Sequence, residues 1–196
     1  MTQAKESVVT RERFESGLTW EAWMQHIKRN IPKFEYNYAE TSVPEDKAAA
    51  LRELAQGDGG PARVLVLGED WCPDVFRGAP VIQRMAEAAG WEIRYFPRDD
   101  NLDIMAEFLK DGQHQSIPSV VFYTRDHRYI THWIERPAKA NAELGQLQGL
   151  FAGLDREKDV QEMRRRNDEF QLGPIWASWR VATIDEVTAL LQAKCG

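Results

Sequence analysis

The sequence predicts an α/β protein: a sandwich with one central mixed β-sheet flanked by helices, and with extra helices at both termini. Two observations predict this class. Strand-like runs and helical patterns alternate between residues 61 and 150, in the order strand–helix–strand–helix–strand–strand–helix. Helical patterns dominate before and after that block. We therefore expect one globular unit with an N-terminal helical extension (residues 1–60), a core (61–150) and a C-terminal helical extension (151–196).

The N-terminal extension is expected to hold helices and one irregular segment. Residues 18–31 (LTWEAWMQHIKRNI) place apolar side chains at helical spacing, with Thr19 as a possible N-cap and Pro32 ending the helix. Residues 34–38 (FEYNY) alternate aromatic and polar side chains, which predicts a short extended segment or a covering loop. Residues 44–57 predict another helix, because a proline opens it, acidic residues follow and a glycine closes it.

The core is expected to begin after the GDGGP run, residues 57–61, the clearest boundary in the chain. The expected core elements are strands at 62–69, 91–98, 116–124 and 128–137 and helices at 72–90 and 101–112. The early alternation implies parallel pairing through a crossover, and the closing hairpin adds an antiparallel edge. The C-terminal part returns to helical patterns, for example at 142–154 and 184–196.

Composition excludes several classes of function. The formal net charge of −6 argues against a nucleic-acid-binding face, and the run Arg164–Arg166 lies among acidic residues that can pair with it on a helix. No apolar stretch is long enough to cross a bilayer, and the polar segment 1–16 lacks the apolar core of a signal peptide, so we expect a cytoplasmic protein. The histidines and cysteines show no metal-ligand spacing, and no cofactor is expected.

Cys72 is the candidate nucleophile. It stands where a strand is expected to end and a helix to begin, and a helix N-terminus stabilises a thiolate. Glu69, Asp70 and Asp74 oppose this effect, and Arg77 could partly offset them. We expect a modest depression of the thiol pKa; the alternative is a buried, inert cysteine.

Val75 stands where a Cys-x-x-Cys pair would place its second cysteine. The second thiol of such a pair resolves the mixed disulfide that the first one forms, and valine cannot do this. Cys72 would then need an outside thiol, such as a small-molecule thiol. Cys195 could resolve the bond only if the C-terminal tail folded back to within disulfide reach, and a frayed-end thiol is the expected alternative.

A proline at the head of an apolar strand run is the second notable feature. Pro118 precedes the run SVVFY and can stand only at the first residue of a strand or at an edge. A cis Ile117–Pro118 bond would turn the preceding backbone outward beside Cys72, where an extended peptide could add as a strand. Spacing alone favours the ordinary trans bond.

Taken together, the WCPDV run (residues 71–75), Pro80 and Ile117–Pro118 resemble the thioredoxin superfamily over roughly residues 61–137. The runs EDWCPD (69–74), RDDNLDIMAEFL (98–109), SIP (116–118) and WIERP (133–137) resemble a bacterial subgroup of thioredoxin-like proteins. The resemblance implies that Cys72 takes the nucleophile's place and that Pro118 is a cis-proline. We expect Trp71, Pro73, Asp74, Ile117 and Pro118 to bind a substrate beside the thiol.

Two structural questions stay open at this stage. Pro80, eight residues after Cys72, predicts a kinked helix or a break into two short helices. The tryptophans of residues 171–183 predict ordinary core packing, or else a lid or a dimer interface in a Gly-Pro-bearing connection.

Three functions compete. The first is a monothiol redox protein whose partner is a protein or small-molecule thiol or disulfide; it predicts that Cys72 alkylates faster than Cys195 near neutral pH. The second is a binding module that docks a peptide or protein at the Cys72/Pro118 edge without redox turnover. The third, a one-cysteine peroxide-reducing enzyme, lacks the Thr or Ser context that this chemistry requires around the thiol.

Overall fold

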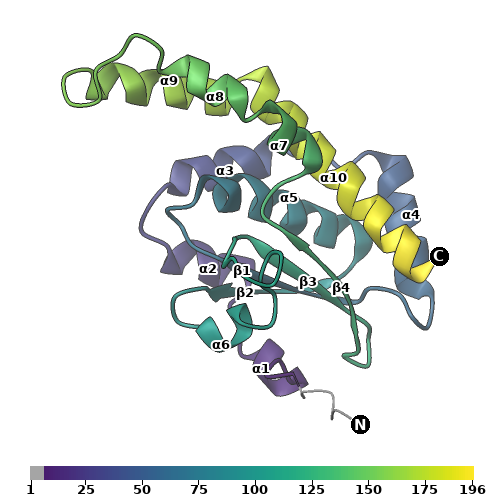
Figure 1. Ribbon diagram of the computed structural model, residues 1–196. Coiled ribbons are helices and arrows are strands. Elements are labelled where there is room, and N and C mark those ends of the chain that lie inside the picture. Colours follow the sequence, from purple (N-terminus) through teal and green to yellow (C-terminus); the bar gives the residue numbers. More distant parts are fainter. Residues whose placement is uncertain (1–6) are drawn as a thin grey trace.

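A four-stranded mixed sheet forms the centre of the molecule (Figure 1). The computed structural model describes residues 7–196, so the first six residues of the predicted N-terminal extension and of the polar segment 1–16 lie outside the described residues. The strands are β1 (Arg63–Gly68), β2 (Glu92–Pro97), β3 (Ser119–Tyr123) and β4 (Tyr129–Ile134), in the spatial order β2–β1–β3–β4. β1 pairs in parallel with β2, and the pairs β1–β3 and β3–β4 are antiparallel. The predicted α/β class and mixed sheet are confirmed.

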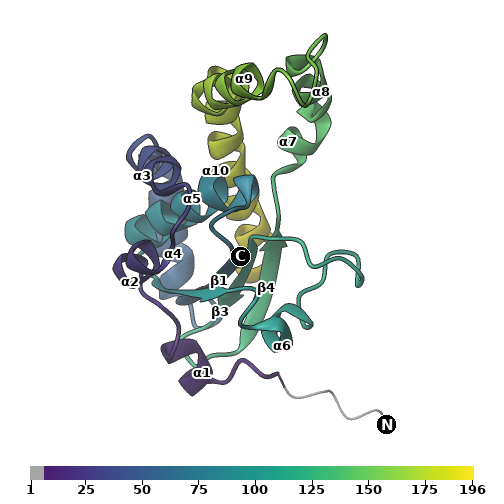
Figure 2. The same ribbon diagram turned by 90° about the vertical axis from the view of Figure 1, so that its left-hand side faces the viewer.

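Helices cover both faces of this sheet. Figures 1 and 2 show α3, α4, α5 and α10 on one side and α1 and α6 on the other, while α8 and α9 project beyond the body. The helices are α1 (Arg11–Glu15), α2 (Trp20–His26), α3 (Ile31–Ala39), α4 (Glu45–Gln56), α5 (Pro73–Ala89), α6 (Leu102–Met105), α7 (Ala138–Glu143), α8 (Gly145–Leu150), α9 (Val160–Leu172) and α10 (Pro174–Cys195). Each of these ten is too short or too polar to span a membrane, as judged over residues 7–196.

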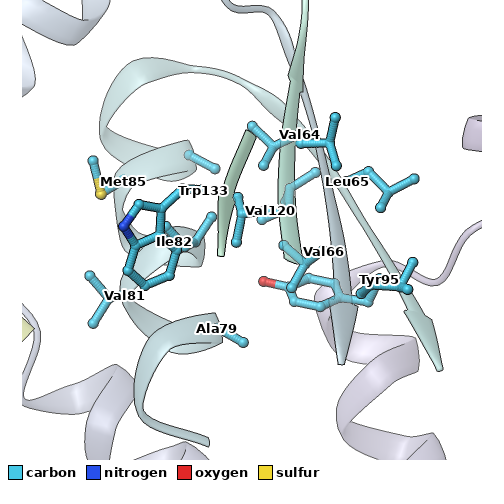
Figure 3. Close-up of a cluster of buried hydrophobic side chains, with 14 of the residues drawn as sticks. Val64, Leu65, Val66, Ala79, Val81, Ile82, Met85, Tyr95, Val120 and Trp133 are labelled. Carbon is cyan, nitrogen blue, oxygen red and sulfur yellow. The ribbon is translucent and has the colours of Figure 1, made fainter. Parts of the chain in front are cut away.

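The core lies between α5 and the sheet. Figure 3 shows Ala79 and Ile82 on the side of α5 that faces the strands, with Val81 and Met85 on its other side and Trp133 of β4 beside the helix. All residues of β1 and of β3 are buried, as expected for strands covered on both faces. α5 runs unbroken through Pro80, which contradicts the alternative of two short helices.

The N-terminal helices differ from the prediction. α2 ends at His26, and Pro32 lies in the first turn of α3 instead of ending a helix. Segment 34–38, predicted to be extended or a loop, is part of α3. The cause is a tertiary contact: the backbone N–H groups of Lys28 and Arg29 donate to the Asp70 carboxylate, so the chain turns here and starts a new helix. The N-cap predicted at Thr19 and the proline predicted to open α4 agree with the structure.

Two more elements differ in extent. Only the first turn of the helix predicted at 101–112 forms; it ends at Met105, and the chain turns back further on, at Asp111 and Gly112, whose φ angles are +53° and +69°. At the C-terminus α10 begins at Pro174, so the tryptophans at 176 and 179 lie on a long helix and are buried. They form ordinary core, and the segment is not an open lid.

Candidate functional site

Cys72 occupies the N-cap position of α5, directly after the loop that leaves β1. Its carbonyl oxygen accepts hydrogen bonds from the backbone N–H groups of Val75 and Phe76, so the side chain stands at the first turn of the helix. The half-buried thiol donates to the carbonyl oxygen of Ile117 at 3.7 Å. The Ile117–Pro118 bond is cis, the isomer that the resemblance implies. The sequence-predicted pair of thiol and proline thus meets in space.

The proline is fixed from two sides. A Cβ built on Gly78 of α5 would lie 3.4 Å from Pro118 Cγ, so the small residue lets the helix approach the proline closely. The Pro118 carbonyl oxygen accepts from the backbone N–H of Glu135, which follows β4. The thiol, the proline and the end of β4 therefore form one contiguous structure.

Val75 completes the core. Its side chain is 0% exposed. A Cβ built on Gly68 would lie 2.7 Å from Val75 Cγ1, so the isopropyl group covers the end of β1 and requires glycine there. Packing explains an apolar side chain at this position, and it leaves Cys72 without a neighbouring thiol.

The acidic residues around Cys72 hold loops in place. Glu69 accepts from the backbone N–H of Asp99 at 2.8 Å, which ties the loop after β1 to the loop after β2. Asp70 accepts from the loop between α2 and α3, as described above, and its carbonyl oxygen accepts from Asn30 Nδ2 at 2.8 Å. Both carboxylates are therefore structural anchors of the thiol loop.

Asp74 belongs to a chain of five alternating charges. Lys110 pairs with Glu135, Glu135 with Arg136, Arg136 with Asp74, and Asp74 with Arg77. Asp74 Oδ2 lies 2.8 Å from Arg136 Nη2, and its Oδ1 lies 2.8 Å from Arg77 Nη1. Arg136 thus comes beside Cys72 from the end of β4.

The guanidinium at the end of this chain is buried against the C-terminal helix. Arg77 is 0% exposed, and its Cζ lies 5.1 Å and 5.4 Å from the ring centroids of Trp176 and Trp179. These distances are typical of cation–π contacts. The contact links α10 to the N-terminal part of α5.

Sequence reasoning missed Lys110, Glu135 and Arg136. The charged pair that directly follows the apolar strand β4 was the available signal, because the last residues of that strand pair with the strand headed by Pro118. Trp71, which follows Asp70 directly before the thiol, is 44% exposed, and Arg98 lies over its ring at 5.6 Å.

The electrostatics of the thiol contradict the expected depression. Burial raises the pKa of Cys72, and the negative charge of Asp74 raises it further. Hydrogen bonds from the backbone N–H groups of Val75 and Asp74 and the positive charge of Arg136 act in the opposite direction and do not outweigh burial. The helix terminus is therefore a weaker influence here than desolvation.

We expect the alkylation rate of Cys72 to keep rising with pH beyond about 8.5, the pKa of an ordinary thiol. Only the thiolate reacts, and a raised pKa moves its formation to higher pH. Iodoacetamide labelling of a Cys195→Ser variant, followed by mass spectrometry across the alkaline range, measures this profile. If the alkylation rate levels off at a lower pH than that of free cysteine, the pKa of Cys72 is not raised and the prediction is wrong.

Cys195 lies at the far end of α10. It is 19 residues beyond Trp176, which packs near the start of α5, and a helix of that length extends roughly 28 Å. Both cysteines are free. With α10 folded, Cys195 is out of disulfide reach of Cys72, and it does not supply the resolving thiol.

Comparisons with known proteins agree on the fold. A family model described as thioredoxin matches residues 17–148. No curated protein matches the chain. A crystal structure of a protein of unknown function from Pseudomonas aeruginosa is similar, with a TM-score of 0.67 and 14% identity over 94% of this chain and 98% of that one. An HIV epitope-scaffold is also similar, with a TM-score of 0.64 and 16% identity over 96% of this chain and 99% of that one. At these identities the two structures show that the fold is shared and nothing further.

Proposed function

The chain belongs to the thioredoxin family, and from that premise we propose that it is a monothiol thiol–disulfide exchange protein that acts through Cys72. The observation that carries the proposal is the position of the sulfur, 3.7 Å from the carbonyl oxygen of Ile117 in a segment with free backbone groups. Among the described residues, the backbone N–H groups of Ser116 and Ile117 donate to no other backbone group. An extended partner segment that added here as a strand would pass beside the thiol.

The exchange has two steps. The Cys72 thiolate attacks one sulfur of a partner disulfide, which forms a mixed disulfide and releases the other sulfur as a thiolate. Val75 offers no second thiol, so an external small-molecule thiolate attacks the partner's sulfur and releases Cys72 as a thiolate. The partner leaves as a mixed disulfide with the small thiol, and the number of disulfide bonds is unchanged.

The raised pKa of Cys72 determines the kinetics of this cycle. A small thiolate fraction makes the first attack slow, and a thiol of high pKa is a poor leaving group. The mixed disulfide is therefore expected to form slowly and to last. Such a site suits capture of a partner better than rapid turnover.

A second function is favoured by the same hydrogen bond. The protonated thiol donates to Ile117, and Val75 gives the site an apolar interior, as a module that docks a peptide without redox chemistry would require. The two proposals differ in whether the sulfur is needed for partner capture.

Replacing Cys72 by serine separates them. We expect the unaltered protein, incubated with oxidised glutathione at mildly alkaline pH, to gain one glutathione adduct on Cys72 by intact-mass and peptide analysis. Cys72→Ser is expected to gain none there, and Cys195→Ser is the matched control that keeps the adduct. If Cys72 forms no adduct and Cys72→Ser still binds a partner peptide or protein, the docking proposal is right and the exchange proposal is wrong.

A further inference from the structure

A cleft lies on the face of the sheet opposite to α5, away from the Cys72 site. It has a volume of about 430 Å³ and lies between the end of α6 and strands β3 and β4. Its lining includes Glu107, Phe108, Tyr123, Tyr129 and His132. Successive side chains of β3 point to opposite faces of the sheet. Val120 and Phe122 pair with the α5-facing residues of β1, so Tyr123 points to the other face, where the cleft lies. The volume is within the range of small-ligand sites.

The hydroxyl of Tyr123 is the unusual group in this cleft. The residue is 2% exposed, and within residues 7–196 its hydroxyl has no hydrogen-bond partner. Burial raises its pKa, as do the charges of Glu107 and Tyr129, so the phenol stays protonated. Tyr123 lines the cleft together with Glu107 and Tyr129. A buried hydroxyl without a partner lowers stability, so the group has a cost that a bound ligand would offset.

The other polar groups are fixed by their own contacts. Glu107 accepts from the backbone N–H of Val8 at 2.7 Å and from Ser7 Oγ at 2.6 Å, and its oxygens retain further lone pairs. The Tyr129 hydroxyl lies 2.6 Å from His132 Nδ1. Burial lowers the pKa of His132, so its ring is neutral near pH 7. The cleft therefore offers a donor and a carboxylate acceptor and no lysine or arginine for an anion.

Aromatic rings supply the remaining walls. The rings of Phe108 and Tyr129 stack with their centroids 6.2 Å apart and their planes at 23°, and the His132 ring packs edge-on against Phe108. Tyr129 is half exposed at the surface of the cleft. Flat faces of this kind favour a flat aromatic ligand.

We propose that this cleft binds a neutral, planar heteroaromatic compound that accepts a hydrogen bond from the Tyr123 hydroxyl and donates one to the Glu107 carboxylate. The site is separate from Cys72 and uses none of its residues. A ring system with one hydrogen-bond acceptor and one donor satisfies both the Tyr123 hydroxyl and the Glu107 carboxylate. The apolar faces of the compound pack against the aromatic side chains of the cleft.

Two probes of nearly equal size test the ligand chemistry on the full chain. Benzimidazole carries a ring donor and a ring acceptor, whereas indole carries the donor alone. We expect benzimidazole, at neutral pH, to shift the backbone amide NMR signals of residues 106–108 and 129–132 and to bind about 10-fold more tightly than indole, the effect of one hydrogen bond to a buried hydroxyl. Equal affinities, or shifts elsewhere in the molecule, would overturn the proposal.

A Tyr123→Phe variant tests the role of the hydroxyl independently. It is expected to raise the melting temperature of the ligand-free protein, because it removes a buried group without a partner, and to lower benzimidazole affinity to that of indole. Tyr38→Phe, which removes a hydroxyl from α3 on the other side of the sheet, is the matched control that keeps the preference for benzimidazole. A lower melting temperature for Tyr123→Phe, or unchanged benzimidazole affinity, would show that the hydroxyl serves the fold and not a ligand.

Discussion

A Val75→Cys variant is expected to form an internal disulfide with Cys72 and to turn over disulfide substrates repeatedly. The backbone N–H of Val75 donates to the carbonyl oxygen of Cys72, so the two side chains leave the same first turn of α5. The new thiol would resolve the mixed disulfide within the molecule, and an intramolecular step replaces one that depends on an outside thiol. In an insulin-reduction assay with dithiothreitol, we expect at least about a 10-fold gain over the unaltered chain.

The control for this variant is Val75→Ser, which is similar in size and has no sulfur. Both substitutions remove buried methyl groups from the contact with Gly68, at a cost of about 1 kcal/mol in the free energy of unfolding for cysteine and more for serine, whose hydroxyl is then buried among apolar groups. A gain of function in Val75→Ser would trace the effect to loosening of the site. If mass spectrometry after oxidation finds no disulfide between Cys72 and the introduced cysteine, the first turn does not align the two sulfurs.

Asp74→Asn and Arg136→Ala are expected to change the reactivity of Cys72 in opposite directions. The Asp74 charge raises the thiol pKa, and the Arg136 charge lowers it. Removing the carboxylate leaves two cations beside the sulfur, so the pKa falls; removing Arg136 leaves Asp74 less compensated, so the pKa rises. Alkylation of Cys72 at neutral pH should become roughly 3- to 10-fold faster in the first variant and slower by a similar factor in the second, for a shift of half to one pKa unit.

Asp185→Asn is the matched control for the Asp74 change. It removes the same charge from an ion pair with Lys47 between α4 and α10, and it should leave the alkylation rate unchanged. Circular dichroism monitors folding, because Asp74→Asn also deprives the buried Arg77 of its carboxylate. A shift of both site variants in the same direction would indicate a general loosening of the site, and the charge explanation would be wrong.

The parts of the fold that depend on local pattern could be predicted from the sequence. The apolar run of β1, the alternation of β2 and the hairpin of β3 and β4 gave the sheet, and Gly90, at φ +74°, closes α5 where the pattern ends. The same holds for the placement of Cys72 beside Pro118, because the residues that carry the resemblance lie in these elements. The start of α3 could not be predicted, since it depends on Asp70, some 40 residues away in the chain.

The direction of the Cys72 pKa shift could not be predicted from the sequence, for a related reason. Whether Asp74 or a helix end dominates a thiol pKa depends on how deeply the sulfur is buried and on which cation approaches it. Here that cation is Arg136, which follows β4 some 60 residues further on. The unpartnered hydroxyl of Tyr123 is likewise invisible in the pattern SVVFY, where a tyrosine looks like any strand residue.

The buried Arg77 cation packs against two neighbouring indole rings, and these rings lie in a part of the chain beyond the family match. The family match ends at residue 148, and Trp176 and Trp179 come after it and cover one side of Arg77. A chain shortened to the matched region would expose a guanidinium to water, free Asp74 to adopt other rotamers and change the surroundings of the sulfur. The region that the family model matches is therefore smaller than the part of the chain that shapes the surroundings of the Cys72 thiol.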